Sequence, residues 1–208
     1  MDINQKKNVA LIVNGEFPRS KEIINQIKAA KIIIAVDGAT NTLIDTGITP
    51  TVSIGDFDSI NLSYKDKVSN TVHVEDQNKT DLEKTLDWCI ENNYLSLSIF
   101  GISGKSEDHF LGNFFAINEY SDTINCTIYT DYSTITPSIG KTIFNSFKGE
   151  TVSIVSFESN NKVTSTNLQY VLDAYKLSPS PRAIRNQSLG NNFTIESSEK
   201  LMVFQIKD

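Results

Sequence analysis

Hydrophobic positions along residues 1–131 follow two alternating rhythms. Short strand-like runs, several of them apolar at successive positions as expected for strands that are buried on both faces, alternate with segments whose apolar residues recur at helical spacing. The runs are residues 8–13, 31–36, 51–54, 71–74, 95–100 and 123–130. The helical segments between them are residues 21–30, 39–47 and 80–93. This alternation predicts an α/β domain with a mainly parallel sheet over residues 1–131.

The segment 80–93 carries the clearest helix signal. Leu82, Leu86 and Ile90 recur every four residues and would share one face of a helix. Glu83 follows Thr80 by three residues, which is the spacing of a capping box. We therefore expect a helix whose N-terminus is capped by Thr80.

The rhythm changes at residue 132. Strand-like segments rich in β-branched and aromatic residues follow one another, with turn signals at Lys148-Gly149 and Asn160-Asn161 and no helical segment between them. These segments are residues 141–147, 150–158, 162–173, 192–197 and 200–207. Residues 132–208 are therefore predicted to form a second, small all-β domain, an antiparallel sandwich or barrel.

Composition narrows the class of protein. The 208-residue chain is 39% hydrophobic and 21% charged, which is typical of a soluble globular protein. Its net charge of −6 argues against a general nucleic-acid binder, because no basic stripe is available for the phosphate backbone. No signal-peptide core or membrane-length apolar run is seen, so we expect a cytoplasmic protein without a membrane anchor. Cys89 and Cys126 have no metal-ligand spacing and are expected to be buried thiols.

Acidic residues follow four of the predicted strands, at the edge of the sheet where open α/β folds bind ligands. They are Asp37, Asp56, Asp58, Asp76, Asp81 and Asp108. A turn or a helix cap would explain any one of them. Acidic residues at four strand ends in one layer would repel each other unless a cation lies among them, and Mg²⁺ prefers oxygen ligands. The pattern therefore predicts a Mg²⁺–phosphate site.

The segment Gly104-Lys105-Ser106 imitates the end of a phosphate-binding P-loop, because it follows a predicted strand and precedes a predicted helix. A P-loop also requires glycine five residues before Gly104, and Ile99 stands there. This excludes a P-loop NTPase and leaves a glycine-rich turn near phosphate.

Three segments, in this order, resemble the signature blocks of the thiamine pyrophosphokinase family. They are VDGATNTLIDTGITPTVSIGDFDSI (residues 36–60), DQNKTDLEKTL (residues 76–86) and GISGKSEDHFLGN (residues 101–113). NGEFP at residues 14–18 is also similar to a segment in bacterial members. The resemblance extends over essentially the whole chain, including the change from α/β to all-β.

The resemblance implies an ATP:thiamine diphosphotransferase, which transfers the pyrophosphoryl group of ATP to the hydroxyl of thiamine and releases AMP. It implies Mg²⁺ as cofactor, ATP and thiamine as substrates, and a homodimer. Matched to the family's blocks, the metal ligands would be Asp56, Asp58 and Asp81, and Asp108 would join them as a catalytic residue. The ATP- and phosphate-binding residues would be Asp37, Gln77, Thr80, Lys84, Lys105, Ser106 and His109. The thiamine-binding residues would be Tyr170, Arg185 and Asn186.

The sequence departs from the family pattern at three positions. Ser106 replaces a common arginine, Asn78 replaces an aspartate, and Arg185-Asn186 replaces a Ser-Asn pair. Asp81 and Asp108 are both candidates for the base that accepts the thiamine hydroxyl proton. Two alternatives stay open: a Mg²⁺-dependent nucleotide hydrolase that uses the same acids, and a non-catalytic thiamine- or nucleotide-binding module, which the changes at positions 106 and 185 make conceivable.

Overall fold

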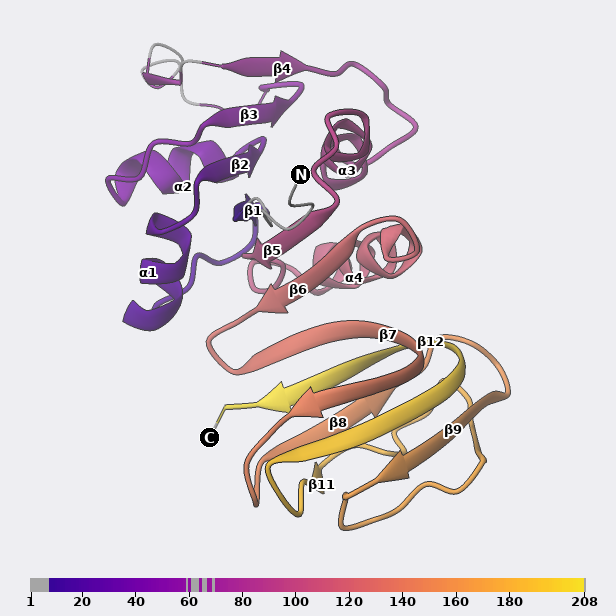
Figure 1. Cartoon of the computed structure of the whole chain (residues 1–208). Coiled ribbons are helices and arrows are strands. Elements are labelled where there is room, and N and C mark those ends of the chain that lie inside the picture. Colours follow the sequence, from indigo (N-terminus) through magenta and orange to yellow (C-terminus); the bar gives the residue numbers. More distant parts are fainter. Residues whose placement is uncertain (1–7, 59, 61–63, 65–66, 69, 208) are drawn as a thin grey trace, which may run out of the picture. The chain divides into compact units, whose positions relative to one another are not determined.

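Two compact units, Met1–Asp131 and Tyr132–Asp208, make up the chain in the computed structural model (Figure 1). The structure describes residues 8–58, 60, 64, 67–68 and 70–207. Within these residues, no helix combines the length and the apolar character that crossing a membrane requires.

A parallel sheet with the strand order β6-β5-β1-β2-β3-β4 forms the centre of the first unit. Every pairing between these neighbours is parallel. All six strands that the apolar runs predicted are present, and the signal is strongest for β1, β2 and β3, which are almost fully buried. They are β1 (Val9–Ile12), β2 (Ile32–Val36), β3 (Val52–Gly55), β4 (Thr71–His73), β5 (Ser96–Phe100) and β6 (Asn125–Tyr129).

Helices cover both faces of this sheet (Figure 1). α1 (Lys21–Lys28) and α2 (Ala39–Asp45) lie on one face, and α3 (Asp81–Glu91) and α4 (Glu107–Tyr120) lie on the other. Ile27 of α1 and Leu43 of α2 are fully buried in a core cluster with Ile12 and Ile33 of the sheet. The helices are thus held by apolar faces, and their N-termini follow the carboxyl ends of the strands.

The N-terminus of α3 has the capping box that the sequence predicted. The Glu83 backbone N–H donates to Thr80 Oγ1 at 3.3 Å, and the Thr80 N–H donates to Glu83 Oε2 at 2.8 Å. Two backbone donors that the helix leaves unpaired are thereby satisfied. The capping box fixes Thr80 and Asp81 at the edge of the sheet.

The order in which the chain adds strands to the sheet reverses between β1 and β5. From β1 it runs to β2, β3 and β4, and then α3 carries it back to the opposite side of β1. The loops that follow β1 and β5 meet there, because the Gly15 N–H donates to the Gly101 carbonyl at 2.8 Å and the Glu16 N–H donates to the Ser103 carbonyl at 2.7 Å. Such a switch point is where open α/β sheets bind ligands.

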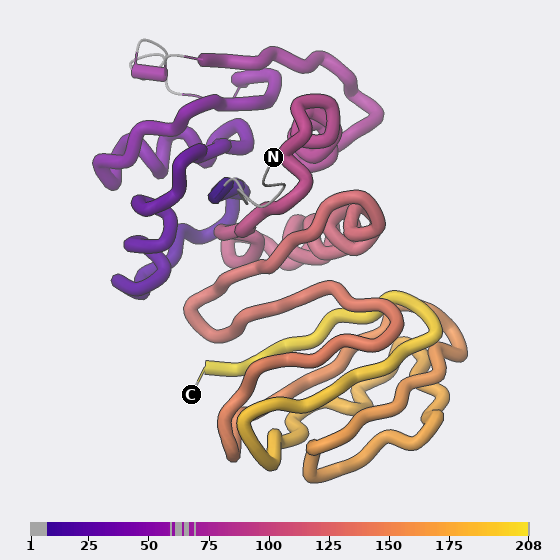
Figure 2. The backbone as a smooth tube through the Cα atoms, in the orientation of Figure 1, coloured from indigo at the N-terminus to yellow at the C-terminus, as the bar shows by residue number. Residues whose placement is uncertain are grey.

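Antiparallel pairing joins the strands of the second unit, and β12 (Asn192–Ile206) is shared between two sets of neighbours. It pairs with β7 (Ser133–Asn145) along its length (Figure 2). On its other side, residues 194–197 pair with β9 and residues 202–206 pair with β8, with an irregularity between Ser197 and Leu201. The remaining strands are β8 (Thr151–Val155), β9 (Asn161–Thr166), β10 (Tyr175–Leu177) and β11 (Asn186–Gln187).

This topology differs from the sequence prediction in four ways, the first of which is that the short strands β10 and β11 were not predicted. The segments 192–197 and 200–207, expected as separate strands, are one strand, because the polar residues between them form a bulge and not a turn. The strand predicted for residues 162–173 ends at Thr166, where Asn167 adopts a left-handed backbone with φ of 62°. β7 begins eight residues before the predicted strand 141–147 and includes Pro137.

Both cysteines are buried and free, as predicted. Burial raises the pKa of the Cys89 and Cys126 thiols to about 12. Neither thiol is therefore ionised near neutral pH, which fits a packing role.

Candidate functional site

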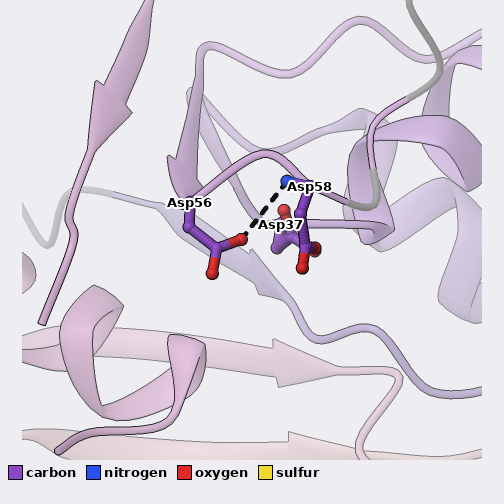
Figure 3. Close-up of side chains that lie close together, drawn as sticks. All are labelled: Asp37, Asp56 and Asp58. Atoms are coloured by element: carbon purple, nitrogen blue, oxygen red, sulfur yellow. Dashed lines mark hydrogen bonds between the residues drawn. The ribbon is translucent and has the colours of Figure 1, made fainter. Parts of the chain in front are cut away.

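Three carboxylates meet where β2 and β3 end (Figure 3). Asp37 follows β2 and is buried, whereas Asp56 and Asp58 follow β3 and are half-buried and exposed. One oxygen from each carboxylate lies within 4.8 Å of the other two. The Asp58 N–H donates to Asp56 Oδ1 at 3.3 Å, which closes the turn that carries the two acids. We call these three residues the acid cluster.

Gly55 allows the acid cluster to assemble. A Cβ atom on Gly55 would lie 2.8 Å from the Cβ atom of Asp37, closer than two such atoms approach. The Asp37 N–H donates to the Ile54 carbonyl at 2.8 Å, which fixes the end of β2 beside the end of β3. Phe57 takes a left-handed backbone with φ of 63° and folds Asp58 back toward Asp56.

The acid cluster fits a hard divalent cation. Its donors are all carboxylate oxygens, and three converging negative charges repel each other in the absence of a counter-charge. Mg²⁺ prefers oxygen ligands and is typically held by one or two carboxylates together with phosphate oxygens. Asp81, which the resemblance assigns to the metal, lies outside this cluster, and its Oδ1 accepts a hydrogen bond from Lys84 Nζ at 3.0 Å.

A pocket of about 400 Å³ lies beside the acid cluster. The loops after β1 and β5 and the first turns of α3 and α4 form its walls, and Val36, the neighbour of Asp37, contributes to its lining. The pocket brings together five of the residues named from the sequence, which are Thr80, Asp81, Lys105, Asp108 and His109. Two carboxylates, one ammonium group and two helix N-termini therefore face one space.

Asp108 has a polar environment that favours its charged form. The Ser106 hydroxyl beside it and then the backbone N–H of His109 hold the pKa of the Asp108 carboxyl below its usual range. A carboxylate in the first turn of α4 is also stabilised by the helix dipole. Asp108 is therefore ionised at neutral pH and is a hydrogen-bond acceptor in the pocket.

Four residues expected at the phosphate site lie outside the lining of this pocket, and one of them is Asp37 of the acid cluster. Gln77 is exposed in the turn after β4. The Lys84 side chain is only 4% exposed, and its ammonium group pairs with Asp81. Ser106 is the N-cap residue of α4. Lys84 thus contacts the pocket through Asp81, and Ser106 contacts it through Asp108.

The pocket residues without an assigned role in the sequence include two asparagines and two glycines, which are Asn14, Gly15, Gly112 and Asn113. Asn14 and Gly15 lie in the NGEFP segment, and Gly112 and Asn113 end the third signature block. Their place in these segments was therefore the one feature of the sequence that pointed to the site. Asn113 Nδ2 donates to the Ile102 carbonyl at 3.1 Å and ties α4 to the loop after β5.

In the second unit, Asn186 is buried and holds the segment that carries Tyr170. Its Oδ1 accepts hydrogen bonds from the N–H groups of Tyr170 at 3.0 Å and Gln187 at 2.9 Å, and its Nδ2 donates to the Tyr170 carbonyl at 2.7 Å. Tyr170 itself is 65% exposed, and Arg185 is exposed with a left-handed φ of 58°. Tyr170 and Arg185 therefore present side chains to the surface, whereas the Asn186 amide is used within the fold.

Comparison with known proteins agrees with this two-unit arrangement. The sequence model described as the thiamin pyrophosphokinase catalytic domain matches residues 24–129, and that of the thiamin pyrophosphokinase substrate-binding domain matches residues 134–204. A crystal structure of thiamine pyrophosphokinase from Bacillus subtilis superposes with a TM-score of 0.79 at 24% identity, and the match covers 96% of this chain and 99% of that one. This likeness shows that the fold is shared.

Curated relatives match over part of their length. Thiamine pyrophosphokinase of Bacillus subtilis is 35% identical over 112 residues, which are 51% of this chain and 52% of the relative. Thiamin pyrophosphokinase 1 of Caenorhabditis elegans is 31% identical over 135 residues, 60% of this chain and 55% of the relative. These matches thus span about half the length of each relative. The two domain models cover most of the chain in the family's order, and the chain belongs to the thiamin pyrophosphokinase family.

Proposed function

We propose that the protein is a Mg²⁺-dependent thiamine diphosphokinase, which converts ATP and thiamine to AMP and thiamine diphosphate. The observation that carries the proposal is the acid cluster beside a pocket of about 400 Å³, at the switch point of the sheet. Family membership supports the reaction, because both relatives named above are thiamine pyrophosphokinases.

Asp37, Asp56 and Asp58 are the residues that would hold Mg²⁺. When bound, the metal supplies charge neutralisation for the phosphate oxygens of ATP. Lys105 and the N-termini of α3 and α4 are suited to bind the same phosphates, since they offer an ammonium group and the positive ends of two helix dipoles. The residues of the pocket would thus fix the triphosphate in one orientation for attack.

In the reaction, the thiamine hydroxyl oxygen forms a bond to the β-phosphorus of ATP. The bond from the β-phosphorus to the oxygen of the α-phosphate breaks, and AMP leaves with that electron pair. The hydroxyl proton passes to a carboxylate, and Asp81 and Asp108 are the two candidates that line the pocket. Asp81 is oriented by the Lys84 ammonium group, and Asp108 by the groups around the α4 N-terminus.

An assay for AMP separates this reaction from its alternatives. With Mg²⁺ and ATP present, we expect AMP to form only after thiamine is added, and in a one-to-one ratio with thiamine diphosphate. A nucleotide hydrolase would release AMP or phosphate without thiamine, and a binding module would release neither. Either of those results would exclude the proposed reaction.

We also propose that the second unit binds thiamine and that the protein is a homodimer. Thiamine has a cationic thiazolium and a flat aminopyrimidine, so an exposed aromatic side chain such as Tyr170 suits it. Arg185 would repel the thiazolium and is expected to face phosphate or solvent. Large apolar side chains that remain exposed on this unit, such as Ile143 and Phe147, favour burial against a second copy.

Asn186→Ala is expected to raise the KM for thiamine about ten-fold or more and to change the KM for ATP less than two-fold. The substitution removes the amide that holds both backbone groups of Tyr170, so the aromatic side chain loses its fixed position. Steady-state kinetics with each substrate varied in turn measures both constants. Equal increases in the two constants would contradict a role for Asn186 in thiamine binding.

A further inference from the structure

Asn14 connects the loop that carries Asp37 to the loop that carries Lys105. Its Oδ1 accepts a hydrogen bond from Lys105 Nζ at 2.8 Å. Its Nδ2 lies on the other side, 2.5 Å from the position that a Cβ atom on Gly38 would take. The amide therefore rests on the bare backbone of Gly38, the residue next to Asp37.

The backbone around Asn14 is held at several points. The N–H groups of Gly15 and Glu16 bond to the loop after β5. At the far end of the loop after β1, the N–H groups of Arg19 and Ser20 each donate a hydrogen bond to the Asp131 carboxylate at 2.9 Å. Asn14 is thus presented by a loop that is fixed at both ends, which a precise contact requires.

Lys105 needs such a contact. Among the described residues that line the pocket, it is the one lysine or arginine, and it shares the pocket with Asp81 and Asp108. A lysine ammonium group on a flexible stem would pair with a nearby carboxylate, which would cancel its charge. A neutral amide oxygen orients the ammonium group and leaves its full positive charge for an anion.

We propose that Asn14 is a positioning residue that holds the Lys105 ammonium group ready for the phosphates of ATP. The proposal rests on the proposed function, because that function supplies the phosphate ligand. It explains why an uncharged residue stands between the acid cluster and Lys105. An aspartate at position 14 would have the same shape but would neutralise Lys105 and add a fourth acid.

Two variants of nearly the same shape test the proposal: Asn14→Leu and Asn14→Asp. Calorimetry with the full chain, Mg²⁺ and ATP is expected to give a Kd about ten-fold weaker for Asn14→Leu and weaker still for Asn14→Asp. The KM for thiamine and the melting temperature are expected to change little. Asn8→Leu is a matched control at the opposite end of β1, where Asn8 Nδ2 donates to the Ala29 carbonyl, and should leave the Kd for ATP unchanged.

A double-mutant cycle with Lys105→Met shows whether Asn14 acts through Lys105. If it does, Asn14→Leu weakens ATP binding in the wild-type protein and has no further effect in the Lys105→Met protein. An unchanged Kd for ATP in Asn14→Leu, or full additivity of the two substitutions, would overturn the role of Asn14. If the wild-type protein still binds ATP, the proposed function is unaffected by that result. Absence of ATP binding by the wild-type protein would overturn both.

Discussion

Thiamine diphosphate formation is expected to fall by about a hundred-fold to a thousand-fold when Asp56 is replaced by asparagine. The amide keeps the shape of the side chain but removes one of the three charges that would hold the metal. The same substitution at Asp37 or Asp58 is expected to have an effect of the same order. Initial rates at saturating ATP, thiamine and Mg²⁺ measure the loss.

Folding is expected to survive this substitution. One fewer negative charge lowers the repulsion within the acid cluster, so the metal-free variant should unfold at the same denaturant concentration as the wild type or at a higher one. Asp122→Asn, which changes an exposed acid just beyond the end of α4, is the control and should retain full activity. Full activity of Asp56→Asn would remove that residue from the site.

Gly15→Ala is expected to lower the free energy of unfolding by about 2–3 kcal/mol and to weaken ATP binding. An added Cβ would collide with the Gly101 carbonyl oxygen and lie 2.5 Å from the Ser103 carbonyl oxygen. Both are backbone atoms of the loop after β5, which cannot move without breaking its hydrogen bonds to Gly15 and Glu16. Denaturant unfolding and calorimetry with ATP measure the two effects.

Gly112→Ala makes the same chemical change with the opposite expected sign. Gly112 lies inside α4, and nothing lies within 4 Å of an added Cβ. Alanine is the better helix former, so this variant should gain about 0.5–1 kcal/mol in the free energy of unfolding. Equal stability of the two variants would show that the loops after β1 and β5 are not in rigid contact.

The strands of the first unit were predictable because β1, β2 and β3 are almost fully buried and the others still have short apolar or β-branched runs between helical segments. The second unit gave a weaker signal, since its strands are partly exposed and its turns are irregular. The bulge between Ser197 and Leu201 has the polar composition of a turn, and only pairing with β7 on both sides of it reveals a continuous strand. The short β10 and β11 depend on partners distant in sequence, which local patterns do not report.

The sequence predicted that the acidic residues lie along one edge of the sheet, but it did not predict which of them converge. Spacing and strand ends indicated that Asp56 and Asp58 act together, and the structure adds Asp37 to them while Asp81 pairs with Lys84. Which carboxylates converge depends on how closely β2 approaches β3 at Gly55. Asn14 could not be assigned from the sequence, because a single asparagine after a strand has the composition of any turn.

The most direct test of the account follows the phosphorus atoms of ATP. The protein is incubated with thiamine, Mg²⁺ and ATP that is radiolabelled at the α-, β- or γ-phosphate in separate reactions. Transfer of the intact pyrophosphoryl group predicts that the β and γ labels both appear in thiamine diphosphate and that the α label remains in AMP. Transfer of the γ label alone, with ADP as the second product, or release of the labels as free phosphate without thiamine, would contradict it.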